Sequence, residues 1–143
     1  MLFGAAVILG YMIVLAVLAV AAPGIGLGGS LIDLVPGDWR DWAHVPAYGL
    51  LAWLVMWGFR RRGWSLIHAT FVGILFTAVF GLWTEVAQGT TPGREPSLHD
   101  VLNDLLGGMV AAALMLWQNR ARSLSPRGVV VSRAVLRCPM KGT

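Results

Sequence analysis

The side chains best suited to chemistry are concentrated between two strongly apolar segments. The stretch 83–112 contains eight of them: Glu85, Gln88, Arg94, Glu95, His99, Asp100, Asn103 and Asp104. Carboxylates and histidines transfer protons or bind cations, and a guanidinium holds phosphate or carboxylate groups. The chain has 57% hydrophobic and only 13% charged residues, about half the charged fraction of a soluble domain. This concentration of polar groups therefore predicts either a site or an ion-pair network that locks helices together.

A second group of polar residues opens an earlier apolar segment. Asp41, His44 and Tyr48 follow one another at positions i, i+3 and i+7. This spacing places all three on one face of a helix. We therefore expect them to face the same neighbour within a helix bundle.

A similar face runs along the last apolar segment. Asp100, Asn103 and Asp104 are followed at helical spacing by Gly107 and Gly108. Small residues allow another helix to approach closely. The carboxylates should face that same neighbour, because exposing them to lipid is costly. This face is thus predicted to be polar at one end and closely packed deeper in.

Two residues of the polar stretch allow alternative interpretations. Glu85 lies at the end of an apolar helix, where an ionisable group is a functional candidate. It either pairs with Arg94 or Arg40, or it serves a ligand. Ser97 and Asp100 match the S/T-x-x-D/E pattern of a helix start. Asp100 is therefore either a capping residue or a site residue.

The sequence predicts no metal site and no cofactor. Histidines and aspartates at 41, 44, 99, 100 and 104 could ligate a divalent cation, but no H-x-x-x-H or H-E-x-x-H spacing is present. The single cysteine, Cys138, makes neither an internal disulfide nor a cysteine-based zinc site. No G-x-S-x-G pattern indicates a nucleophilic serine.

Four apolar segments must position these residues. They span about 2–22, 43–59, 64–88 and 98–117, lengths that suit membrane-crossing helices. The first could be a signal peptide ending near 19–21, but it lacks a basic start, so we expect a retained helix. The predicted fold is an all-α membrane protein with four transmembrane helices in an antiparallel bundle. The domain covers 1–117, and 118–143 is a basic, flexible cytoplasmic tail.

The distribution of charge predicts the orientation. Nine of the eleven basic residues lie in the short link 60–62 and in the tail, whereas all seven acidic residues lie in 33–41 and 85–104. The positive-inside rule places the N- and C-termini in the cytoplasm and the connectors 23–42 and 84–100 outside. Tryptophans at both ends of the segments agree with this topology. Basic charge sorted in this way predicts a membrane protein without a nucleic-acid partner.

Two motifs resemble those of the VanZ-like family of small bacterial membrane proteins. The first consists of Glu85, Gln88, Pro92-Gly93-Arg94, Ser97, Asp100, Asn103 and Gly107, and the second of His44 and Tyr48. The resemblance implies four transmembrane helices in the bacterial inner (cytoplasmic) membrane and a link to resistance against the glycopeptide teicoplanin. It implies no defined reaction. The family often has an Asp-Lys pair before the histidine, where this chain has Arg40-Asp41.

Three functional hypotheses follow. The first is a polar pocket at the extracytoplasmic face that binds membrane lipids, a cell-wall precursor or a glycopeptide. Its expected ligand-binding residues are His44, Tyr48, Glu85, Gln88, Arg94, Asp100 and Asn103. The second is an acid–base enzyme acting on a lipid-linked or cell-wall precursor, with Glu85 and His44 as the catalytic candidates. The third is an ion-pair lock without any ligand.

Overall fold

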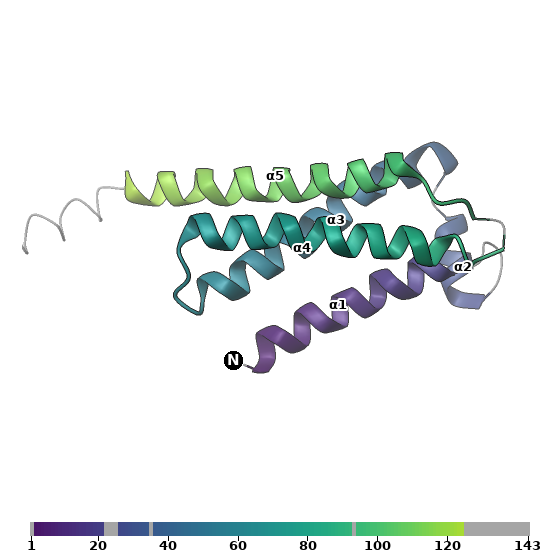
Figure 1. The fold of residues 1–143 in the computed structure, drawn as a ribbon, viewed down its shortest axis with the longest axis horizontal. Helices are drawn as coiled ribbons and strands as arrows, with labels where there is room; N and C mark the ends of the chain where they lie inside the picture. The colour runs from purple at the N-terminus through teal and green to yellow at the C-terminus, as the bar shows by residue number, and fades with distance from the viewer. Residues whose placement is uncertain (1, 22–25, 35, 93, 125–143) are drawn as a thin grey trace, which may run out of the picture. The chain divides into compact units, whose positions relative to one another are not determined.

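The chain folds into helices throughout the part that the structure describes. A computed structural model describes residues 2–21, 26–34, 36–92 and 94–124. These residues form α1 (Leu2–Val20), α2 (Gly26–Asp33), α3 (Gly37–Arg60), α4 (Leu66–Gln88) and α5 (Leu98–Ser123), with no strand among them (Figure 1). The predicted all-α class is confirmed. Gly93 and residues 125–143, which include most of the predicted tail, lie outside the described residues.

Three of these helices are long and apolar enough to cross a membrane. They are α1 over Phe3–Val20, α4 over Leu66–Gln88 and α5 over Leu98–Ser123. Helix α3, the fourth predicted span, is not among them. It is less apolar because Arg40, Asp41 and His44 stand in its first two turns.

The connector predicted between 23 and 42 is more helical than its composition suggests. It contains all of α2 and the first six residues of α3, which starts directly after Pro36. Gly26 opens α2 with a φ of +66°, a conformation that glycine adopts without strain. The early start of α3 places Arg40 in a helix as well as Asp41, which the sequence pattern had already placed on a helical face. At the other end, α5 continues to Ser123 and includes the first residues of the predicted tail.

The chain divides into two compact units, Met1–Ala112 and Ala113–Thr143. The boundary lies within α5, five residues before the predicted domain end at 117. All the polar residues discussed below lie in the first unit. In that unit α3 and α4 form an antiparallel hairpin, and α1 packs against both. Gly63, with a φ of +83°, closes the hairpin link.

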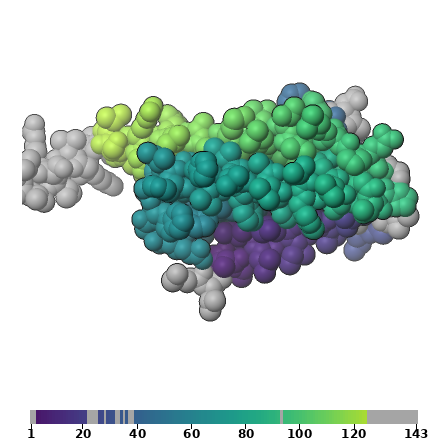
Figure 2. All heavy atoms as spheres, in the orientation of Figure 1, coloured from purple at the N-terminus to yellow at the C-terminus, as the bar shows by residue number. Residues whose placement is uncertain are grey.

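Helix α4 has two contrasting faces. Its exposed stripe is large and apolar: Ile67, Phe71, Leu75, Val79, Leu82 and Val86. Apart from Phe80, its buried residues are small or polar: Ala69, Thr70, Gly73, Thr77, Gly81, Thr84, Glu85 and Gln88. A helix of a soluble protein exposes polar residues and buries apolar ones, so the arrangement on α4 is the opposite. It suits a lipid environment, where small and polar residues gather at helix interfaces. Figure 2 shows α4, in teal to green, with α1, in purple, beside it.

The glycines of α5 pack against the backbone of other helices. A Cβ added at Gly107 would collide with the Val45 carbonyl oxygen and lie 2.8 Å from the Gly49 nitrogen, both on α3. A Cβ at Gly108 would meet the side chain of Thr77 on α4 at an ordinary 3.6 Å. The predicted close-packing face of this helix is confirmed. It holds the polar start of α5 against α3 and α4.

Candidate functional site

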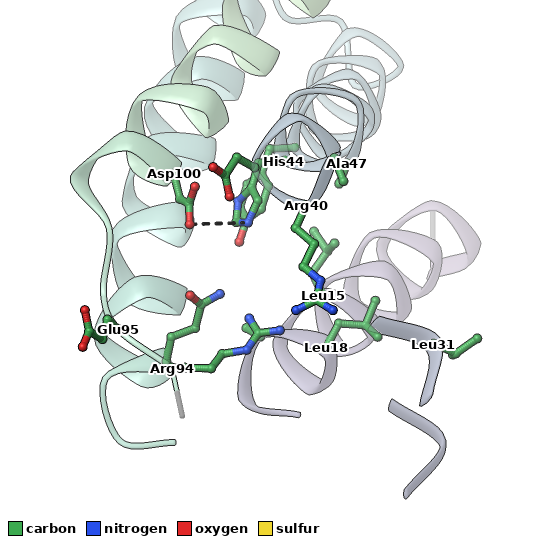
Figure 3. A pocket seen from close by; sticks show the side chains of 14 residues that line it. Leu15, Leu18, Leu31, Arg40, His44, Ala47, Arg94, Glu95 and Asp100 are labelled. Atoms are coloured by element: carbon green, nitrogen blue, oxygen red, sulfur yellow. Dashed lines mark ion pairs between the residues drawn. The ribbon is translucent and has the colours of Figure 1, made fainter. Parts of the chain in front are cut away.

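A pocket of about 420 Å³ lies where the start of α3, the end of α4 and the start of α5 meet (Figure 3). Five of the seven predicted ligand-binding residues line it: His44, Tyr48, Gln88, Arg94 and Asp100. Its other walls are Leu15, Leu18, Ala19, Leu31, Arg40, Asp41, Ala43, Ala47 and Glu95. The predicted residues Glu85 and Asn103 lie outside the lining.

His44 is held by a carboxylate from α5. Its Nδ1 lies 2.8 Å from Oδ1 of Asp104, a residue with no exposed surface. When Asp104 is ionised its carboxylate only accepts hydrogen bonds, and Nδ1 of His44 then donates to it. The Nε2 atom is then a free lone pair when the ring is neutral. It lies 4.0 Å from Oδ2 of Asp100, as the dashed line in Figure 3 marks.

Glu85 takes the place that a capping residue would occupy at the start of α5. In a capping box, Asp100 would accept a hydrogen bond from the backbone N–H of Ser97. Here Oε2 of Glu85 accepts that bond at 2.7 Å, from twelve residues earlier in the chain. Glu85 thus links the end of α4 to the start of α5. Asp100 is released from capping and approaches His44 instead.

Several carboxylate oxygens of this region are buried without a hydrogen bond. Among the described residues these are Oε1 of Glu85, Oδ1 of Asp100 and Oδ2 of Asp104. Glu85 is only 3% exposed. The guanidinium of Arg94 does not bond to Oε1, so the sequence alternative of a direct Glu85–Arg94 pair does not account for this oxygen. We call His44, Glu85, Asp100 and Asp104 the His44 cluster.

Tyr48 packs beneath His44, and its hydroxyl is already used. The two rings are parallel, with centroids 5.7 Å apart. The Thr84 hydroxyl donates to the Gly81 carbonyl at 2.8 Å, so the Tyr48 hydroxyl must donate to Thr84. A ligand in the pocket therefore meets the ring of Tyr48 and not a free hydroxyl.

Asn103 has a structural contact at the start of α3. Its side-chain nitrogen donates to the backbone carbonyl of Asp41 at 3.0 Å and approaches Nδ1 of His99 at 3.3 Å. Asn103 is 6% exposed. It fixes the position of α5 against α3, and a bound molecule in the pocket would not reach it directly.

Two arginines extend into the pocket from different elements. Arg40 comes from α3 and Arg94 from the link between α4 and α5, and Figure 3 shows both guanidinium groups directed into the same space. Partial burial lowers the pKa of the Arg94 guanidinium from its ordinary value. The positive charge of Arg40 lowers this pKa further, whereas Glu85 and Asp100 act in the opposite direction. The two cations repel each other, and an anion bound between them would relieve that repulsion.

Some residues of the candidate site were not among those predicted from the sequence. Asp104 follows Asp100 at i+4 and therefore lies on the same helical face. This spacing is the sequence signal that could have identified Asp104 as a partner of His44. The apolar wall from Leu15, Leu18 and Ala19 on α1 has no motif that could identify it. Tyr11 ties this wall to the site, because its hydroxyl donates to the Ala47 carbonyl at 3.0 Å.

Two groups of described residues have ligand atoms close enough to share a cation. His44, Glu85 and Asp100 form the more buried group, and Asp41, His99 and Asp100 form the more exposed one. Each residue of a group offers one ligand atom, and these atoms lie within 4.8 Å of one another. The first group draws on three helices, so no spacing along the sequence could reveal it. Neither group contains a cysteine.

Comparison with known proteins found no match: no family model, no curated protein and no solved structure corresponds to this chain.

Proposed function

We propose that the chain is a VanZ-like membrane protein with four membrane-crossing helices and both termini in the cytoplasm. The charge distribution and the exposed apolar stripe of α4 support this topology. Helix α3 has 24 residues, and at about 1.5 Å per residue it is long enough for a bilayer core. The pocket then faces outward, because it lies at the opposite end of α3 and α4 from the basic link Arg60–Arg62. The resemblance to the VanZ-like family implies that this membrane is the bacterial inner membrane.

The function we propose is the binding of an anionic, phosphate-bearing lipid or lipid-linked cell-wall precursor in this pocket. The observation that carries it is the convergence of Arg40 and Arg94 on a cavity that also has an apolar wall from α1 and α2. Guanidinium groups hold phosphate through paired, charge-assisted hydrogen bonds. The leucines of α1 and α2 provide a surface for the first methylene groups of a lipid chain.

The size of the pocket favours a headgroup over a complete antibiotic. Its volume of about 420 Å³ lies in the lower half of the range of small-molecule sites. A phosphate with part of a sugar or glycerol fits this volume, whereas a whole glycopeptide does not. A connection with teicoplanin resistance would therefore act through the bound precursor, and a change in teicoplanin susceptibility on expression of the chain would test it.

Lipid binding by the purified full chain tests the proposal. Detergent-solubilised protein is titrated with phosphatidylglycerol and with undecaprenyl phosphate, and phosphatidylcholine serves as the uncharged control. We expect Arg94→Ala to weaken binding of the anionic lipids by roughly 10-fold or more, since a hydrogen bond to a charged group contributes about 1.5–3 kcal/mol. Arg61→Ala, at the other end of α3, is the matched control and should bind as the wild type does.

Equal affinity for phosphatidylcholine, or an Arg94→Ala variant that binds like Arg61→Ala, would contradict the proposal. A variant that only lowers the amount of folded protein would favour the ion-pair lock. Replacing Arg94 with lysine separates charge from geometry, because lysine keeps the charge but lacks the paired donors of arginine. Intermediate affinity is expected for Arg94→Lys.

The acid–base enzyme is a second candidate, and one specific observation favours it. Asp104 fixes the proton of His44 on Nδ1 and directs Nε2 toward the pocket, the arrangement of a histidine base oriented by a carboxylate. If the wild type turns over a lipid-linked substrate, Glu85→Gln and His44→Ala should each lower the rate by about 10²–10⁴-fold. If the wild type binds the lipid but does not convert it, the enzyme is excluded and lipid binding remains as the proposed function.

A further inference from the structure

We propose that His44, Glu85 and Asp100 form a binding site for a divalent transition-metal ion of the Zn²⁺ or Mn²⁺ type. The ligands would be Nε2 of His44 with one carboxylate oxygen each from Glu85 and Asp100. This site departs from the sequence prediction, which expected no metal. It lies at the wall of the pocket but does not depend on which molecule the two arginines bind.

The first argument is the geometry of the three ligand atoms. They belong to α3, α4 and α5, and all lie within 4.8 Å of one another. Metal bonds of about 2.0–2.2 Å place two ligands of a tetrahedral ion about 3.3 Å apart. The ligand atoms are therefore at most about 1.5 Å too far apart for such an ion. Rotation of the carboxylate side chains can close this gap without moving a helix.

The second argument is that two of the three proposed ligands carry an unsatisfied acceptor oxygen. Glu85 is 3% exposed, and its Oε1 has no hydrogen-bond partner among the described residues. Oδ1 of Asp100 is also buried and has no hydrogen-bond partner. A buried carboxylate oxygen without a partner costs free energy, and a cation removes that cost by supplying both charge and a bond. The competing explanation is that one of these carboxyl groups is protonated.

The third argument is that other groups already orient two of the three ligands. Metal-binding histidines usually donate their other ring N–H to a carboxylate, which fixes the ring. Asp104 does this for His44 at 2.8 Å. The Ser97 N–H holds one oxygen of Glu85 at 2.7 Å and leaves the other one available. Neither ligand would have to give up a hydrogen bond to bind the ion.

Three protein ligands leave at least one coordination position for a water or a ligand group. The donor set, one imidazole and two carboxylates, suits Zn²⁺ and Mn²⁺ better than the cations that bind only oxygen. The second cluster, Asp41, His99 and Asp100, shares one residue with this site, but Asp41 and His99 are exposed. A substitution in this exposed cluster therefore serves as the control for substitutions in the proposed site.

Metal binding by the full chain in detergent tests the site. The protein is stripped with a chelator, equilibrated separately with Zn²⁺, Mn²⁺ and Co²⁺, and desalted before its metal content is measured by mass spectrometry. Affinity follows from competition with a chromophoric chelator. We expect one ion per chain, and with Co²⁺ an absorption spectrum typical of mixed nitrogen and oxygen ligands.

Matched variants assign the ligands. His44→Ala and Glu85→Gln should weaken binding by about 100-fold or more, and Asp104→Asn by about 10–100-fold, as for partners that orient a metal-bound histidine. His99→Ala, another histidine from the same end of the bundle, should keep the affinity of the wild type. The wild-type Co²⁺ spectrum reports the ligands even if a variant does not fold.

Three outcomes would overturn the proposal. The wild type could retain no more metal than a buffer blank, which would indicate a protonated carboxyl group in the His44 cluster. A folded His44→Ala variant could bind as tightly as the wild type. Loss of binding in His99→Ala with retention in His44→Ala would assign the ion to the exposed cluster. None of these results bears on lipid binding by Arg94, so the two proposals fail separately.

Discussion

Replacing Gly107 with alanine should separate α5 from α3 and open the candidate site. The added Cβ would collide with the carbonyl oxygen of Val45, lie 2.8 Å from the nitrogen of Gly49 and 3.2 Å from the carbonyl carbon of Val45. All these atoms belong to the backbone of α3, so no side-chain rotation can relieve the contact. The helices must move apart instead.

The neighbouring glycine provides the control. A Cβ at Gly108 would meet Thr77 at 3.6 and 3.7 Å and Ile74 at 3.8 Å, which are ordinary contacts. Overpacking costs about 1–3 kcal/mol, and the rigid backbone neighbours of Gly107 place it at the upper end. Alanine gains up to about 1 kcal/mol over glycine within a helix. We expect Gly107→Ala to lose about 2 kcal/mol net and Gly108→Ala to gain up to about 1 kcal/mol.

Thermal unfolding of both variants in one detergent, followed by circular dichroism, measures this difference. A difference of about 3 kcal/mol in unfolding free energy between the two variants corresponds to a difference of roughly 6–12 °C in melting temperature for a chain of this size. Metal and lipid binding should also weaken in Gly107→Ala, because the movement draws Asp104 away from His44. If Gly107→Ala melts at or above the temperature of Gly108→Ala, the close approach of α5 to α3 is refuted.

Three further substitutions test individual contacts. In Gly81→Ala the new Cβ would collide with the Asp104 carboxylate, so metal affinity should fall by about 10–100-fold, and an unchanged affinity would contradict this. Tyr48→Phe leaves Thr84 without its donor and should cost about 1–2 kcal/mol of unfolding free energy, whereas the same substitution in a Thr84→Val background should cost nothing, because the tyrosine hydroxyl has no acceptor there. Asn103→Asp places a carboxylate oxygen against the backbone carbonyl of Asp41 at the start of α3, so its melting temperature should be lower than that of Asn103→Ala. A higher melting temperature for Asn103→Asp would exclude the hydrogen bond from Asn103 to Asp41.

Periodicity along the sequence predicted the helices and the faces that meet at the site. The faces of α3 and α5 were identified from positions such as His44 and Asp100, which repeat at helical spacing. The close packing at Gly107 followed from residue size. These features depend on residues a few positions apart on one helix, which is the range that a sequence pattern covers.

Pairings between helices could not be predicted in the same way. The bond from Glu85 to Ser97 and that from His44 to Asp104 depend on how far each helix is rotated and shifted against its neighbours. Periodicity fixes neither quantity. The glycines and prolines of 23–42 also concealed α2 and the first turns of α3, because both residue types usually mark loops. The helical position of Arg40 followed from the structure alone.

Glu85→Gln distinguishes the metal site from a protonated cluster by the sign of its effect on stability. Glutamine has the shape of glutamate, so its amide oxygen can accept the Ser97 N–H while its NH₂ occupies the position of Oε1. In metal-free protein the substitution replaces a buried, unpaired acceptor with an NH₂ group that lies among the acceptor atoms of His44 and Asp100, and it should stabilise by about 1–3 kcal/mol. With Zn²⁺ in excess, the wild type gains stability from the bound ion and the variant does not, so the order of the melting temperatures should reverse. A variant that is more stable than the wild type at every Zn²⁺ concentration would mean that a proton, and not a metal ion, neutralises the His44 cluster.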